Sequence, residues 1–256
     1  MISKTLIFLS LVYLCAGIVD AVCGGGGLFT VPALMSVGLA PHMVVGTNQC
    51  SLILGNITSI YKYARSGNIN YRIALMALPF TLVGAVIGAK LNLIMSERQL
   101  QIVMIVLIPI LAVFSFFKRD IGNEDHSDEL PARKLFISTA LIGLVVSAYH
   151  AFYGPASGLF FLLLFCAVTK LDVLKSNGVT KIILFVACLT SGATYALSGN
   201  VYWPAVFLDS ITYIIGNYIG STLAIHKGAK IVKPAFYVML VFLFIKLILD
   251  FYATRG

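Results

Sequence analysis

The chain has 256 residues, of which 59% are hydrophobic and only 11% are charged, and its mean hydropathy is +0.97. An average soluble domain carries about 25% charged residues, so this composition excludes a soluble domain of any size and indicates a membrane protein. The formal net charge is +8, but the Lys and Arg residues stand singly or in small groups along the chain. That spread is typical of residues that orient a protein in a membrane and does not favour binding to nucleic acid.

Apolar segments long enough to cross a membrane recur along the whole chain. A helix needs about 20 apolar residues to span about 30 Å of hydrocarbon. About eight such helices are expected, at residues 5–22, 44–61, 73–94, 100–117, 135–149, 178–197, 201–224 and 231–251. Two shorter apolar segments, 28–39 and 155–169, follow the first and the fifth of these. Lys4 precedes the first segment as in a signal peptide, but no small-residue cleavage site follows it, which favours an uncleaved anchor.

Four consecutive glycines, Gly24, Gly25, Gly26 and Gly27, interrupt the apolar run "VDAVCGGGGLFTVP". Glycine weakens a helix and lets the backbone turn sharply, so these residues predict a break in the membrane. The segment after the break begins with unbonded N–H groups and the positive end of a helix dipole, which suit an anion. The alternative is close packing between helices, to which we give less weight because packing glycines are normally one turn apart.

A second break is predicted at the matching place in the other half, in the stretch "YHAFYGPASG" at 149–158. Gly154 and Pro155 interrupt the helix there, and proline suits the first turn of the next one. Ser157 belongs to the same break and is a candidate ligand group. Paired broken helices in corresponding positions of two halves indicate the central site of a transporter.

Polar and ionisable residues flank the two breaks. Lys181 is expected to supply positive charge to a buried anion, and Asp20 or His150 to carry a proton. Two alternatives are that Lys181 extends to the nearby surface and that Asp20 caps the broken helix. Asn48 in "GTNQCS" and Asn177 in "KSNGVTK" are candidate neutral donors to an oxyanion, or simply helix caps.

Five cysteines lie in apolar segments, with no CxxC motif and no histidine at metal-ligand spacing: Cys15, Cys23, Cys50, Cys166 and Cys188. They are interpreted as packing thiols, and no metal or cofactor is expected. A rival hypothesis is an intramembrane thiol enzyme or sulfur relay that uses Cys23 or Cys50 as a nucleophile. Asp209 is a weaker candidate for a functional acid, because Ala77 stands at the equivalent place in the first half.

The chain contains two copies of one unit. "YARSGN" at 63–68 recurs as "YALSGN" at 195–200, and "GAVIG" and "GNYIG" follow each copy at the same spacing. The "GAVIG" glycines are of the close-packing kind. The hydrophilic stretch 118–134, which holds half of the acidic residues, is interpreted as a linker between a first repeat (1–117) and a second repeat (135–256).

The positive charges discriminate between two topologies. If the short segments dip into the membrane and return, Lys and Arg show no bias between the sides. If they complete a passage, each half crosses five times, and most Lys and Arg residues fall on the side of the linker. The positive-inside rule favours the second arrangement, with inverted copies, a cytoplasmic linker and both termini extracytoplasmic.

The stretches "GIVDAVCGGGGLFTVPAL", "VVGTNQCSLILGN" and "YHAFYGPASGLFFLLLF" together resemble the sulfite exporter TauE/SafE family, also called the toluene-sulfonate uptake permeases. The resemblance covers almost the whole chain. It implies a bacterial-type inner-membrane carrier for sulfite, sulfoacetate or related organosulfur anions. It supports Asn48, Gly154, Asn177 and the four glycines at 24–27 as family positions. The second glycine cluster is often fuller in relatives, so the two half-sites are expected to be unequal.

The expected protein is therefore an all-α polytopic membrane protein that works as a secondary transporter of a small anion, not as an enzyme. No nucleotide-binding P-loop is present, so an ion or proton gradient is expected to drive it. The expected partners are the anion and the lipid bilayer, with a possible homo-oligomer and no nucleic acid. An anion channel and the thiol enzyme are the alternatives.

Overall fold

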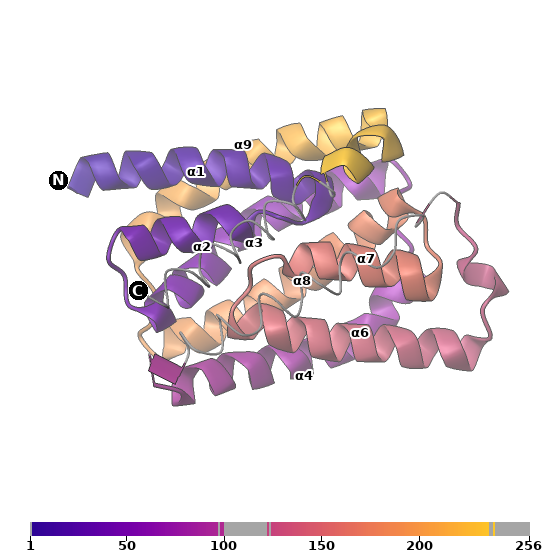
Figure 1. Ribbon diagram of the computed structural model, residues 1–256, viewed down its shortest axis with the longest axis horizontal. Coiled ribbons are helices and arrows are strands. Elements are labelled where there is room, and N and C mark those ends of the chain that lie inside the picture. Colours follow the sequence, from indigo (N-terminus) through magenta and orange to yellow (C-terminus); the bar gives the residue numbers. More distant parts are fainter. Residues whose placement is uncertain (1, 97, 100–121, 123, 236–237, 239–256) are drawn as a thin grey trace, which may run out of the picture.

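The computed structural model describes residues 2–96, 98–99, 122, 124–235 and 238, and this part of the chain is built of helices without strands (Figure 1). The helices are α1 (Ile2–Cys23), α2 (Gly27–Ser36), α3 (Pro41–Arg65), α4 (Tyr71–Ile94), α6 (Ala132–Phe152), α7 (Ser157–Thr169), α8 (Val173–Leu197) and α9 (Trp203–Lys227), with a 3-10 turn η1 (Ser127–Glu129). Four of the described segments are long and apolar enough to cross a membrane: Lys4–Cys23, Tyr71–Ile94, Ala132–Phe152 and Val173–Leu197.

Most of the segments predicted from the sequence coincide with helices to within a few residues. Helices α3 and α9 stand where crossings were predicted at 44–61 and 201–224; each has 25 residues but is more polar than the four apolar spans. The two short apolar segments, predicted at 28–39 and 155–169, form α2 and α7. The segment predicted at 100–117, and most of the one predicted at 231–251, lie outside the described residues.

Residues with known capping chemistry begin three of the helices. The side chain of Asn70 accepts a hydrogen bond from the Ile73 amide at the start of α4. The side chain of Asp172 accepts one from the Lys175 amide at the start of α8. Pro41 opens α3, where the missing amide hydrogen costs no helical hydrogen bond. The boundaries therefore follow from local sequence.

Glycines on α9 determine how that helix runs beside α1. A side chain at Gly216 would overlap the carbonyl oxygen of Leu14, and one at Gly220 would overlap that of Ile18. The residue numbers rise together on both helices, so α1 and α9 run parallel in close contact. The same geometry joins α4 to α6.

Gly84 and Gly88 of α4 face the carbonyl oxygens of Leu144 and Ala148 of α6, and these two helices also run parallel. The predicted close-packing role of the "GAVIG" glycines is thereby confirmed. Because α4 belongs to the first half and α6 to the second, the pair α4–α6 corresponds to the pair α9–α1 with the halves exchanged.

Helices α3 and α8 lie against each other in opposite directions. Gly46, near the start of α3, approaches the Asn200 carbonyl just beyond the end of α8, and Gly178, near the start of α8, approaches the Asn68 carbonyl just beyond the end of α3. Each helix therefore begins where the other one ends. The short helices α2 and α7 run back beside α1 and α6 respectively (Figure 1).

The connection between α7 and α8 lies against the linker. Lys175 forms an ion pair with Asp125 at 2.7 Å, and the His126 amide donates to the Lys170 carbonyl at 2.9 Å. Partial burial raises the pKa of Asp125, but hydrogen bonds from Lys175 and Ser127 outweigh it and leave that pKa below its ordinary value. The carboxylate is thus charged at neutral pH. This contact is the one required if the short segments complete a passage, because it places 170–175 on the linker's side.

The contact between α4 and α6 can be tested with one substitution. Gly88→Val would push a branched side chain into the Ala148 carbonyl, and overpacking of this kind costs about 1–3 kcal/mol. We expect a clear fall in the thermal unfolding temperature in detergent. The neighbouring Ile87 is 45% exposed, so Ile87→Val serves as the control and should change little. Equal unfolding temperatures for both variants would contradict the packing described here.

Candidate functional site

The two helix breaks meet in the interior. Helix α1 ends at Cys23 and α6 at Phe152, and between each of them and the next short helix the backbone turns through a glycine of positive φ, Gly24 at +80° and Gly154 at +102°. The backbones of Gly24 and Gly158 touch, so that a Cβ on either residue would collide with main-chain atoms of the other. Both breaks thus belong to one central region.

Close packing accounts for most of the four adjacent glycines. A Cβ at Gly26 would lie 2.8 Å from both the Ala16 carbonyl oxygen and the Asp20 Cβ, and one at Gly27 would lie 3.2 Å from the Pro155 Cα. A spacing of one turn is expected of packing glycines only within a helix. In a turn, consecutive residues point to different neighbours, so adjacent glycines can each meet a different segment.

Asp20 and Lys181 form a buried ion pair between the halves. The Lys181 Nζ lies 2.6 Å from the Asp20 Oδ2 and also donates to the Asp20 carbonyl at 2.5 Å. Lys181 has no exposed surface and Asp20 is 5% exposed, so Lys181 does not extend to the membrane surface. The Gly26 amide donates to the Asp20 Oδ1 at 3.4 Å. Asp20 therefore has two roles: it forms the ion pair with Lys181 and it caps the start of α2.

His150 occupies the corresponding place in the second half, among neutral partners. Its Nδ1 lies 2.6 Å from the Ser157 Oγ and its Nε2 3.3 Å from the Cys188 Sγ. Cys188 donates to the Gln49 Oε1 at 3.3 Å, and the Gln49 Nε2 donates to the His150 carbonyl at 2.6 Å. A neutral imidazole with its proton on Nε2 satisfies every one of these contacts. Gln49 and Cys188 were not among the candidates predicted from the sequence.

Gln49 on α3 and Lys181 on α8 make the same kind of contact. Each reaches across to the other half and donates to the carbonyl of the residue one turn before the break, Gln49 to His150 and Lys181 to Asp20. They lie in the register that also pairs Gly46 with Gly178. One half-site therefore holds a charge pair, and the other holds only neutral groups.

The two candidate asparagines differ in what they contact. The Asn177 Nδ2 donates to the carbonyls of Ala21 and Val22, at 3.0 and 2.8 Å, and to the Tyr63 hydroxyl at 2.7 Å. Asn177 thus holds the end of α1. Asn48 accepts a hydrogen bond from the Tyr13 hydroxyl at 3.1 Å, which leaves its amide group to face the second break.

Asp209, the weaker candidate for a functional acid, lies on α9. The residue has no exposed surface, and neither carboxyl oxygen has a hydrogen-bond partner among the described residues. Ionisable groups isolated within a membrane domain are commonly part of proton or ion pathways. An acid inside an otherwise apolar run was the available signal, and the absence of a counterpart in the first half masked it.

Among the described residues, the thiols named for a rival enzyme donate hydrogen bonds to backbone carbonyls. The Cys23 Sγ lies 3.5 Å from the Val19 carbonyl, and the Cys50 Sγ lies 3.7 Å from the Gly192 carbonyl. The cysteine that meets a histidine is Cys188. Across the described part of the chain, no group of His, Cys, Asp and Glu side chains is arranged to hold a metal ion.

The sequence profile of the family described as "Sulfite exporter TauE/SafE" matches residues 9–247. The chain belongs to this family. It is accordingly a multi-pass membrane protein of a membrane transporter family. As a TauE/SafE member it is 31% identical to "Probable membrane transporter protein ORF9" of Sinorhizobium sp, over 96% of this chain and 93% of that protein.

Two further relatives of this TauE/SafE chain carry similar names. It is 27% identical to "Probable membrane transporter protein YfcA" of Escherichia coli (strain K12), over 92% of this chain and 86% of the relative. It is also 27% identical to a "Probable membrane transporter protein" of Haemophilus influenzae, over 92% of this chain and 91% of the relative. No solved structure matches the chain significantly.

Proposed function

We propose that the chain is a secondary transporter that carries a small sulfur-containing anion, such as sulfite or an organosulfonate, across the cytoplasmic membrane by alternating access. The observation that carries this proposal is the buried Asp20–Lys181 pair beside the meeting point of the two breaks. A buried ammonium group in a membrane protein is costly, and those that are present commonly mark the pathway of a substrate or an ion. The description of the family supplies the sulfur-containing anion as the substrate class.

Two inverted repeats, with about eight full crossings and the short helices α2 and α7, fit this mechanism. Corresponding helix pairs recur with the halves exchanged, and the equivalent helices α3 and α8 point in opposite directions. Rocking of one such repeat against the other exposes a central site to each side in turn. The positive-inside rule then puts the linker in the cytoplasm and both termini outside.

A proton on Asp20 links the ion pair to transport. While Asp20 is charged it neutralises Lys181 at 2.6 Å, and an anion has no free positive charge to bind. When Asp20 takes up a proton, the Lys181 ammonium loses its partner and can hold the anion through a charge-assisted hydrogen bond. Anion and proton would then cross together, with the side-chain amide groups of Gln49 and Asn48 as neutral donors.

Flux measurements in proteoliposomes test this proposal. We expect saturable uptake of one or more of sulfite, thiosulfate, taurine and sulfoacetate that is stimulated by a pH gradient. Asp20→Asn should remove the dependence on the gradient and leave anion exchange, because Lys181 then has no competing carboxylate. Flux that does not saturate would indicate a channel, and unchanged pH dependence in Asp20→Asn would refute the coupling.

Two sets of variants separate the site from its alternatives. Asn48→Leu and Asn177→Leu, made separately, are each expected to impair transport, Asn177→Leu because the end of α1 loses its anchor. Near-normal transport in both variants would exclude the two asparagines from the transport site. Replacing Cys23 and Cys50 together by alanine should leave flux unchanged, since the described hydrogen bonds of both thiols go to backbone carbonyls; loss of activity would favour the thiol relay.

A further inference from the structure

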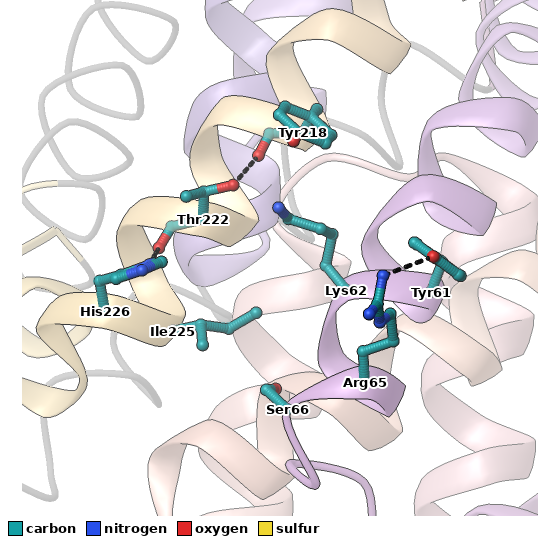
Figure 2. Close-up of a pocket in the computed structure, with 8 residues that line it drawn as sticks. All are labelled: Tyr61, Lys62, Arg65, Ser66, Tyr218, Thr222, Ile225 and His226. Carbon is teal, nitrogen blue, oxygen red and sulfur yellow. Dashed lines mark hydrogen bonds between the residues drawn. The ribbon is translucent and has the colours of Figure 1, made fainter.

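A pocket of about 400 Å³ opens between the ends of α3 and α9, away from the central site (Figure 2). Helix α3 contributes Lys62 and Arg65, and α9 contributes His226. Ser66 and Thr222 also line the pocket, and none of the described lining residues is a carboxylate. The lining is therefore cationic, and Lys and Arg side chains are the groups that bind a phosphate group.

Aromatic rings hold the two cations in place without neutralising them. The Lys62 Nζ lies 4.0 Å from the centroid of the Tyr218 ring, and the Arg65 Nη1 donates to the Tyr61 hydroxyl at 3.0 Å (Figure 2). Cation–π contacts orient an ammonium group but leave its charge available. Neither cation forms an ion pair with a carboxylate in the described part of the chain. An anion entering the pocket thus meets two positive charges that no carboxylate of the described residues neutralises.

The equivalent position in the other repeat has no such chemistry. In the register that pairs Gly46 with Gly178, Lys62 corresponds to Thr194 and Arg65 to Leu197. Leu197 is 91% exposed. Helices α8 and α4 therefore pack together without cations at the equivalent positions. The fold itself does not require cations at the ends of α3 and α9.

The surroundings of the pocket indicate a lipid as the source of the phosphate. Tyr61 and Tyr218 are 57% and 55% exposed, as aromatic residues are at the membrane interface. Exposed apolar residues continue from each tyrosine along the same helix face towards the bilayer centre: Leu54 and Ile57 on α3, and Ile211 and Ile215 on α9. The spacing of three, four and seven residues puts each set on one stripe, along which acyl chains can lie.

We propose that this pocket binds the phosphate headgroup of an anionic phospholipid in the leaflet on the linker's side of the membrane. The headgroup phosphate accepts hydrogen bonds from Lys62 and Arg65, and the acyl chains cover the two apolar stripes. The crowding of Lys and Arg on that side, including Arg72 at the start of α4, attracts the anionic lipid into this position.

Native mass spectrometry of the purified chain in neutral detergent tests the site, with phosphatidylglycerol, phosphatidylcholine and inorganic phosphate as the probes. We expect phosphatidylglycerol to bind about tenfold more tightly than phosphatidylcholine, and the double variant Lys62→Gln/Arg65→Gln to reduce its binding to the level of phosphatidylcholine. Lys227→Gln is the matched control, because Lys227 is exposed near the same helix end but does not line the pocket, and it should bind as the unchanged chain does.

Several outcomes would overturn the proposal. Equal losses in Lys227→Gln and the double variant would mean diffuse charge attraction, and equal binding of both lipids would remove the role of the headgroup charge. Displacement of phosphatidylglycerol by millimolar inorganic phosphate would make the pocket a site for a free anion instead. The charge-conserving variant Lys62→Arg/Arg65→Lys guards against misfolding, since it should unfold at the normal temperature and keep most lipid binding; loss of selectivity in this folded variant would also refute the site.

Discussion

Replacing Lys181 with glutamine is expected to abolish saturable anion transport and to lower the free energy of unfolding by about 3–5 kcal/mol. The substitution leaves the Asp20 carboxylate buried without the ammonium group that now lies 2.6 Å away. Removing one member of a buried ion pair is costly because the remaining charge stays desolvated. Thermal or denaturant unfolding in detergent measures the first effect, and proteoliposome flux the second.

The double variant Asp20→Asn/Lys181→Gln separates these two effects. No charge remains in the half-site, so most of the lost stability should return, whereas transport should not, because the anion has lost its cation. Lys175→Gln is the matched control on the same helix: its ion pair with Asp125 is partly exposed, and its loss should cost no more than about 1 kcal/mol. Normal flux in Lys181→Gln would refute the role given to this residue. Failure of the double variant to regain stability would show that the two side chains do not act as a pair.

The second large effect is expected at the crossing of the two breaks. Gly158→Ala would place a methyl group 2.5 Å from the Gly24 carbonyl oxygen, and main-chain atoms on both sides leave little room for adjustment. We expect a loss of about 3 kcal/mol, at the upper end for overpacking, together with loss of transport.

Gly154→Ala provides the matched control for this substitution. The nearest atom to its Cβ would be 3.4 Å away, so space is adequate, but φ is +102°. The expected cost is about 1–2 kcal/mol from the backbone conformation alone. Thermal unfolding of both variants distinguishes overlap from backbone strain. A larger loss in Gly154→Ala than in Gly158→Ala would contradict the close crossing.

Much of the architecture could be predicted from the sequence, because it depends on local physical chemistry. Hydrocarbon thickness sets helix length, so apolar runs gave the positions of helices such as α4 and α6 closely. Glycine and proline gave both breaks, at 24–27 and 154–158, for the same local reason. The glycines of "GAVIG" showed their packing role by their spacing of one turn.

The contacts within the candidate site could not be predicted in the same way, since they depend on register between distant segments. Alignment of the motifs "GTNQCS" and "KSNGVTK" puts Asn48 opposite Asn177, so the sequence alone suggests that these two asparagines correspond. In the structure the correspondence between α3 and α8 is shifted by three residues from that alignment, so Lys181 corresponds to Gln49. Asn177 then lies at the end of α1, a position that no local pattern could reveal.

The isolated position of Asp209 also depends on how segments distant in the sequence pack together. A sequence shows that an acid lies in an apolar run, but only the packing of α9 shows that both carboxyl oxygens lack partners among the described residues. Likewise, the pairing of Cys188 with His150 joins α8 to α6 across residues that share no motif.

The contact between Gly24 and Gly158 has a mechanical consequence. Two bare stretches of backbone touch there, with no side chains that interlock. If the halves rock against each other as we propose, such a point would serve as a fulcrum, about which one half could tilt while few side-chain contacts change. The contact that leaves no room for a Cβ atom on either glycine is thus also the contact about which the halves could rotate with the fewest changes in side-chain packing.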